Sequence, residues 1–188
     1  NLPAEINIIQ GDRESLRITA EDDILPKIET KVVSGELELT FKKNENIQTT
    51  EPIQIDLQLK TLNGMDFFGA ALVKASKIKS DRLEINSSGA SSIEIDSLQG
   101  KRLTIDLSGT GKIRLAGRVD KQEVSLSGVG KYEGSKLRTL STDIDISGAG
   151  KATVWVERSL NIDLGGVGKV SYYGNPQVTE DVSGIGKI

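Results

Sequence analysis

Lysines that follow a repeated glycine phrase are the residues in this sequence with the clearest potential for chemistry. The phrase "SGTGKI" at residues 108–113 returns as "SGVGKY", "SGAGKA", "GGVGKV" and "SGIGKI". A glycine-rich loop ending in Gly-Lys suggests phosphate binding, but such loops have the form Gly-x-x-x-x-Gly-Lys-Ser/Thr and lie between a strand and a helix. Here no Ser or Thr follows the lysine, and a strand pattern comes next. The phrase therefore favours a structural turn over a nucleotide site.

The lysine holds the same place in each of the five copies, so stacked copies would align these side chains in a column. One interpretation is a solvated edge that discourages aggregation, which is the usual role of surface charge. The other is a cationic stripe for an anionic polymer such as an acidic polysaccharide or lipopolysaccharide. The residues concerned are Lys112, Lys131, Lys151, Lys169 and Lys187.

Aspartates recur before the glycines, at Asp106, Asp145, Asp163 and Asp181, with Ser125 in one copy. A carboxylate column suggests Ca²⁺ binding or the acid and base of a glycoside hydrolase. Calcium-binding β-roll repeats, however, place the acid after the glycines. An Asp between two inward apolar residues points to solvent, so we expect these carboxylates to pair with the lysines. We predict no catalytic residue, no metal site and no cofactor.

Composition excludes several classes of protein. The chain of 188 residues has no Cys and no His, which excludes disulfides, thiolate sites, a Ser-His-Asp triad and His-ligated zinc. Its net charge of −3 gives no reason to expect nucleic acid as a partner. Seven aromatic residues make stacking platforms hard to assemble, and no apolar stretch is long enough to span a membrane.

The repeat itself predicts the architecture. Equivalent glycines lie 18 to 20 residues apart, and each unit alternates apolar and polar residues on both sides of the turn. A meander or barrel of hairpins is one arrangement, but the constant period favours a parallel β-helix with one unit per coil. Its interior columns would be Ile105, Val124, Ile144 and Ile162, and Leu107, Leu126, Ile146 and Leu164.

Glycines at the turns are expected to serve the fold, by adopting positive φ at the corners and by allowing close stacking of backbone between coils. They are Gly109, Gly111, Gly128, Gly130, Gly148, Gly150, Gly166, Gly168, Gly184 and Gly186.

Residues 1–64 lack the phrase but also contain strand patterns. We expect a β-rich N-terminal cap or irregular first coils there, followed by the repeat β-helix over 65–188; the two parts can also form one continuous domain. Phe67 and Phe68 are candidates to plug the interior of a degenerate first coil.

The opening "INIIQGDRESLRITAEDDILPKIETKV", the Ser-Gly-x-Gly series and "VSYYGNPQV" resemble the putative auto-transporter adhesin head GIN domain family. The resemblance implies a right-handed, single-stranded parallel β-helix, similar in shape to pectin lyases, in bacterial proteins that are usually exported to the cell envelope. It implies no established catalytic residues. Where that family commonly has Asp after Gly-x-Gly, this chain has Lys, which puts any shared ligand of the corner in doubt.

These observations favour a non-catalytic β-helical module, secreted, periplasmic or on the outer cell envelope of a bacterium. It would act in adhesion or as a scaffold for ligand or assembly, with a cell-surface glycan or protein as partner and self-association through coil ends as a further option. The alternative is a carbohydrate-active enzyme of the polysaccharide lyase or hydrolase kind, or a glycan-binding module. Arg114, Arg118 and Arg138 are then candidate bases. A hexapeptide acyltransferase fits less well, because it has a strict 18-residue coil and usually a catalytic His.

Overall fold

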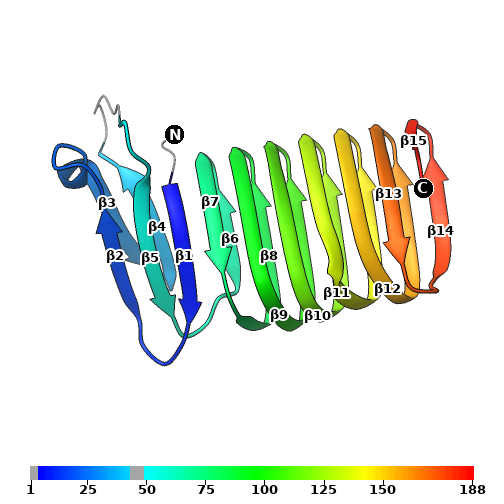
Figure 1. Cartoon of the computed structure of the whole chain (residues 1–188), viewed down its shortest axis with the longest axis horizontal. Coiled ribbons are helices and arrows are strands. Elements are labelled where there is room, and N and C mark those ends of the chain that lie inside the picture. Colours follow the sequence, from blue (N-terminus) through cyan, green and yellow to red (C-terminus); the bar gives the residue numbers. More distant parts are fainter. Residues whose placement is uncertain (1–3, 43–48) are drawn as a thin grey trace.

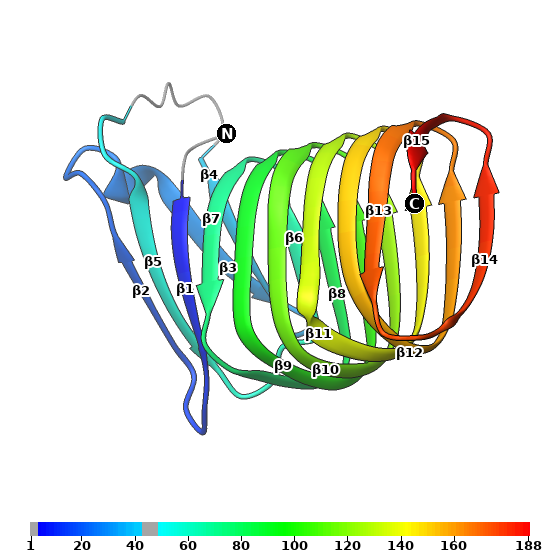
Figure 2. The same cartoon turned by 45° about the vertical axis from the view of Figure 1, so that its right-hand side comes forward.

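The structure, a computed structural model, describes residues 4–42 and 49–188 and consists almost entirely of β-strands. Its repeat region forms a stack of parallel coils along one axis (Figure 1), and each coil closes around an interior that Figure 2 shows from an oblique angle. Only one short 3-10 helix, η1 (Leu25–Lys27), occurs in these residues. The strands are β1 (Ala4–Gln10), β2 (Ser15–Thr19), β3 (Ile28–Val33), β4 (Glu36–Phe41), β5 (Ile53–Leu59), β6 (Gly64–Phe67), β7 (Ala70–Ala75), β8 (Ile78–Ser87), β9 (Ala90–Leu107), β10 (Thr110–Leu126), β11 (Val129–Ile146), β12 (Ala149–Leu164), β13 (Val167–Tyr173), β14 (Gln177–Val182) and β15 (Ile185–Lys187).

Successive units pair in parallel and in register, as the constant period predicts. Val124 pairs with Ile105 on one side and Ile144 on the other, and Ile144 pairs in turn with Ile162. The only antiparallel pairs in the described residues are β2 with β5 and β3 with β4, both in the N-terminal region. The repeat region is therefore a β-helix, and the hairpin alternative is wrong.

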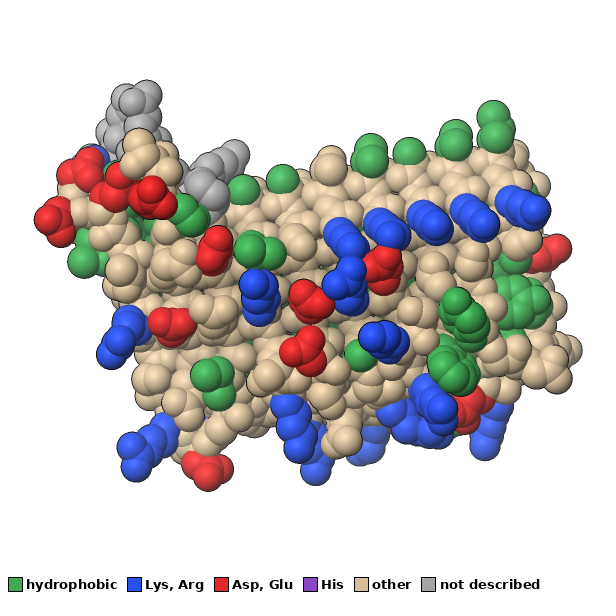
Figure 3. All heavy atoms as spheres, in the orientation of Figure 1, with side chains coloured by type: hydrophobic (Ala, Val, Ile, Leu, Met, Phe, Trp, Pro, Cys, Tyr) green, Lys and Arg blue, Asp and Glu red, His purple; other side chains and the backbone are tan. Residues whose placement is uncertain are grey.

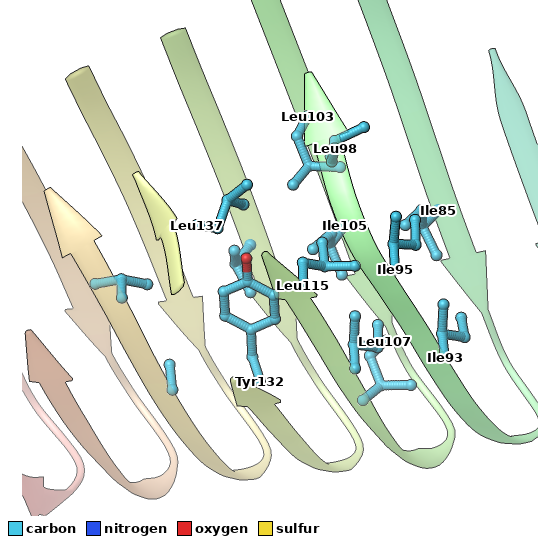
Figure 4. Close-up of a cluster of buried hydrophobic side chains, with 14 of the residues drawn as sticks. Ile85, Ile93, Ile95, Leu98, Leu103, Ile105, Leu107, Leu115, Tyr132 and Leu137 are labelled. Atoms are coloured by element: carbon cyan, nitrogen blue, oxygen red, sulfur yellow. The ribbon is translucent and has the colours of Figure 1, made fainter. Parts of the chain in front are cut away.

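The interior is filled by the two predicted columns of aliphatic side chains, all of them 3% exposed or less. Period-2 alternation in each strand sends these side chains inward and their polar neighbours outward. Figure 4 shows Ile105, Leu107 and Leu115 converging with Ile93 and Ile95 in the space between the walls of the coils. Because burying a Leu or Ile contributes roughly 1.5–3 kcal/mol, and no single coil can enclose its own apolar face, neighbouring coils stabilise one another.

The corner glycines allow close stacking, but they do not supply positive φ. Positive φ among the described glycines occurs only at Gly35, Gly117 and Gly174, so that part of the prediction is wrong. A Cβ on Gly109 would instead lie 2.0 Å from the carbonyl oxygen of Gly89, and one on Gly128 would lie 1.9 Å from that of Gly109. Backbone of one coil therefore occupies the space that a side chain on the next would need.

The N-terminal region continues the parallel stack. β1 lies between β5 and β7 and pairs in parallel with both. Ile24, Ile53 and Ile55 form a second small core there. Division of the chain into separate parts at residue 64 stays a prediction.

The interpretation of Phe67 and Phe68 as an interior plug is half wrong. Phe67 packs against the main core, whereas Phe68 is 79% exposed. Phe67 ends β6 in register with the buried Ser87, and the chain turns immediately after it, so Phe68 points outward at the corner.

Candidate binding face

The five phrase lysines stand in register on adjacent coils. Lys131 pairs with Lys112 and Lys151, and Lys169 pairs with Lys151 and Lys187. The residues directly after four of them are Ile113, Tyr132, Ala152 and Val170, all fully buried, so alternation turns the lysines outward. Figure 3 shows a row of Lys and Arg side chains across the right-hand coils, below an edge lined by hydrophobic side chains. We call Lys112, Lys131, Lys151, Lys169 and Lys187 the lysine column.

Lys112 and Lys131, the upstream lysines, both form ion pairs with one carboxylate, that of Glu133. Lys112 Nζ lies 3.2 Å from Glu133 Oε2, and Lys131 forms a second ion pair with Glu133. Arg114 also binds Glu133 through Nε at 3.1 Å and Glu94 through Nη1 at 3.1 Å. Hydrogen bonds from Lys131, Arg114 and Lys112 lower the pKa of Glu133 to about 2. The upstream lysines are therefore engaged in ion pairs, although the cluster of Lys112, Lys131 and Arg114 with Glu94 and Glu133 keeps one net positive charge.

Lys151, Lys169 and Lys187, the downstream lysines, have no such partner: among the described residues, no carboxylate lies within 4.0 Å of their Nζ atoms. The difference arises at the outward position two residues after each lysine. Glu133 pairs in register with Thr153, and Thr153 pairs with Ser171, so the acid is replaced by hydroxyls in the next two coils.

The predicted pairing of lysines with the aspartate column does not form in the described part of the chain. Asp106, Asp145, Asp163 and Asp181 are exposed, and none forms an ion pair there. Sequence reasoning missed Glu133 as the partner, although the signal was present. Glu133 lies two residues after Lys131, and period-2 alternation places both on the same face.

The aspartates line a shallow groove of about 730 Å³ together with Glu123, Asp143 and Glu180. Lys121 bridges Glu123 and Asp143 at 2.9 and 3.1 Å, and Asn161 donates a hydrogen bond to Asp143 at 2.7 Å. Within residues 4–42 and 49–188, no three acidic side chains converge as metal ligands would.

The candidate arginine bases are engaged elsewhere. Arg114 is held by Glu94 and Glu133, and Arg118 Nη1 lies 3.2 Å from Glu157 Oε1. The guanidinium of Arg138 lies 4.6 Å from the centroid of the Trp155 ring. None of the three lines the acidic groove.

Two of the few aromatic residues come together on the outer face, although the low aromatic content made a stacking platform hard to expect. Arg138 pairs in register with Trp155, and Trp155 pairs with Tyr173. The Trp155 and Tyr173 ring centroids are 6.1 Å apart, with 37° between the planes. Hydrophobic side chains are visible on this face below the right-hand end of the lysine row (Figure 3).

Comparison with known proteins agrees with this geometry. The family described as "Putative auto-transporter adhesin, head GIN domain" matches residues 1–176. The chain belongs to this family. No curated protein matches the chain.

Solved structures of similar shape come from Bacteroides and Parabacteroides species. A putative adhesin from Bacteroides fragilis is 27% identical, with a TM-score of 0.94 over 98% of this chain and 87% of that one. A putative lipid binding protein from Parabacteroides distasonis is 21% identical, with a TM-score of 0.72 over 100% of this chain and 90% of that one. A putative adhesin from Parabacteroides merdae is 17% identical, with a TM-score of 0.69 over 100% and 88%. The two more distant structures establish only a shared fold. In the described residues, no helix has the length and apolar character needed to cross a membrane.

Proposed function

We propose that this family member is a non-catalytic adhesion module, secreted or held at the bacterial cell envelope, that binds an anionic glycan through the downstream lysines. One observation carries the proposal: Lys151, Lys169 and Lys187 stand in register without an acidic partner within 4.0 Å in the described residues.

Repulsion between the aligned lysines favours binding of a polyanion. Equivalent positions in adjacent coils are ~4.8 Å apart, and two like charges at that distance in water repel by about 1 kcal/mol. A polyanion that places its acid groups against the column would relieve this repulsion and exchange its small counterions for lysines. The family description and the name of the similar Bacteroides fragilis protein support a role in adhesion.

Binding can be tested with polygalacturonate as the acidic probe and dextran as a neutral polymer of comparable size. The parent protein is expected to bind polygalacturonate at low salt, to lose affinity as salt is added, and to ignore dextran. Replacing the downstream lysines together (Lys151→Gln, Lys169→Gln, Lys187→Gln) should abolish binding. The matched control, Lys112→Gln with Lys131→Gln, should keep most of it, because both of these lysines are already held in ion pairs with Glu133. Failure of the parent to bind at low salt would refute the proposal.

The acidic groove supports a competing function, that of a carbohydrate-active enzyme, because carboxylates on a β-helix face can serve lyase or hydrolase chemistry. Incubation of the parent with polygalacturonate and Ca²⁺ separates the two. We expect the polymer to remain intact, whereas release of unsaturated products would replace the binding module with a lyase.

A further inference from the structure

Beside the lysine column, Arg138, Trp155 and Tyr173 combine two features that an acidic sugar needs from a protein. One is an aromatic pair with an exposed ring, that of Tyr173, and the other is a guanidinium that forms no ion pair within the described part of the chain. We infer that these three residues form a subsite for one acidic sugar residue, with the ring stacked on the aromatics and its acid group on Arg138. The inference rests on the proposed function and gives its ligand a chemical class, an oligosaccharide of uronic or other acidic sugars.

The aromatic pair is built for contact with a ligand rather than for the core. Tyr173 is 55% exposed, although the interior of the same coils is filled by aliphatic side chains. The Trp155 and Tyr173 rings, 6.1 Å apart and inclined by 37°, lie in the usual range for an aromatic pair. Tyr and Trp keep an apolar face and a polar edge at the surface, which is why binding sites are enriched in them.

Arg138 supplies the charge at this platform. Its guanidinium lies 4.6 Å from the Trp155 ring centroid, and no carboxylate of the described residues forms an ion pair with it. Arg118, one coil upstream in the same column, is instead held by Glu157 at 3.2 Å. A free guanidinium offers two parallel donors that match a carboxylate or sulfate, and stacking on Trp155 holds its plane in place.

The subsite and the downstream lysines share one face. Lys151, Thr153 and Trp155 alternate outward along β12, and Lys169, Ser171 and Tyr173 do the same along β13. Four residues of strand separate each lysine from the ring on its strand by ~13 Å. A chain of acidic sugars along the strands can therefore stack one ring on the aromatics and direct the next acid groups to Lys151 and Lys169. A single sugar is too short to reach both.

Trp155 offers a direct reporter, because it is the only tryptophan in the chain. Oligogalacturonates of increasing length are titrated into the parent while tryptophan emission is followed, with maltooligosaccharides of equal length as neutral probes. We expect a saturable change in emission with the acidic oligomers, at the concentrations where calorimetry detects binding, and a much weaker response to galacturonate monomer.

Variants test each part of the subsite. Trp155→Ala and Tyr173→Ala should each weaken oligogalacturonate binding by about tenfold, whereas Trp155→Phe should retain most of the affinity. Arg138→Gln should weaken binding of the acidic oligomers while leaving any response to the neutral ones unchanged. Because Arg138 is exposed and lies outside the core, this variant keeps the test informative even if Trp155→Ala impairs folding.

The outcomes separate this inference from the proposed function. The subsite would be overturned if binding depended on the lysines but left the tryptophan emission unchanged and kept its full affinity in Tyr173→Ala and Arg138→Gln. The proposed adhesion module would remain. Equal responses to neutral and acidic oligomers would overturn the assignment of an acidic sugar. Absence of binding by the parent in every titration would overturn both.

Discussion

The two ends of the lysine column share the repeated phrase and the backbone register but differ in the ion pairs of their lysines. Lys112 and Lys131 share Glu133, whereas Lys151 and Lys169 face Thr153 and Ser171 at the equivalent positions. The repeated phrase therefore determines where each lysine stands, and a residue outside the phrase determines whether its charge is available. Repetition in a β-helix specifies the scaffold, while the departures from repetition define the candidate site.

If the two ends share one backbone, they should be equally sensitive at their corners. Gly109→Val upstream and Gly166→Val downstream each place a Cβ 2.0 Å from a carbonyl oxygen of the preceding coil. Backbone must move to accommodate either change, so both should destabilise the fold by well over the ~1 kcal/mol of a generic glycine substitution. Urea unfolding of both variants measures the effect, which is the largest that we predict.

Gly165→Ser is the matched control, because Ser occupies this position in the other copies of the phrase. A Cβ on Gly165 meets nothing nearer than Ser183 Oγ at 3.8 Å, so we expect a change within about 0.5 kcal/mol. The close-stacking account of the corners would be contradicted if the urea midpoint of Gly109→Val or Gly166→Val were as close to that of the parent as the midpoint of the control is.

Sequence alone was sufficient for the scaffold because its determinants repeat. The period predicted parallel stacking, and alternation around residues such as Ile105 and Leu107 identified the core columns. The reason for the corner glycines was only partly predictable. Both positive φ and close approach favour Gly, and only the inter-coil distance distinguishes them.

The aromatic platform was beyond prediction for a physical reason. Between Gly134 and Arg138, β11 departs from register with β12, so that Gly134 pairs with Val154 while Arg138 pairs with the very next residue, Trp155. A count of residues along the repeat would not align Arg138 with Trp155. The location of such an irregularity depends on packing between coils and is not encoded in the period.

Removing the carboxylate upstream and introducing one downstream should have opposite effects on polygalacturonate affinity. Glu133→Gln would release the upstream lysines and is expected to raise polygalacturonate affinity several-fold, since the change adds one net positive charge and frees both lysines from their ion pairs. Thr153→Glu would place a carboxylate two residues after Lys151, in the position that Glu133 holds relative to Lys131, and should lower affinity. Thr153→Gln controls for side-chain size, and isothermal titration at low salt is the measurement. Equal affinities for Glu133→Gln and Thr153→Glu would break the comparison.

The acid dependence of stability should report the same ion pairs. The pKa of Glu133 is about 2 in the folded chain and 4.5 in the reference state, so its carboxylate stabilises the fold fully above pH 4.5. This contribution is lost as the pH falls from 4.5 to about 2. The difference in urea midpoint between the parent and Glu133→Gln should therefore be constant from pH 7 to 5 and shrink below pH 4.5. A difference that grows as pH falls would contradict the pairing.

The smallest predicted effect concerns the interior position directly after each lysine, which is Tyr132 upstream and Ala152 downstream. Burial raises the pKa of Tyr132, and its hydroxyl has no hydrogen-bond partner of acceptable geometry in the described residues. Tyr132→Phe removes this buried polar atom while keeping the ring, so the melting temperature should stay equal or rise slightly. A marked fall would show that Tyr132 and the buried Gln122 amide stabilise each other.

The central claim is that the downstream lysines alone are available to a polyanion, and the salt dependence of polygalacturonate binding tests it most directly. Each lysine that displaces counterions contributes about 0.7 to the slope of log K against log salt concentration. Changing the downstream lysines to Gln should flatten the slope by about 2, and changing Lys112 and Lys131 should leave it nearly unchanged. Slopes that fall equally per lysine in both variants would contradict the claim, because the two ends of the column would then be equivalent.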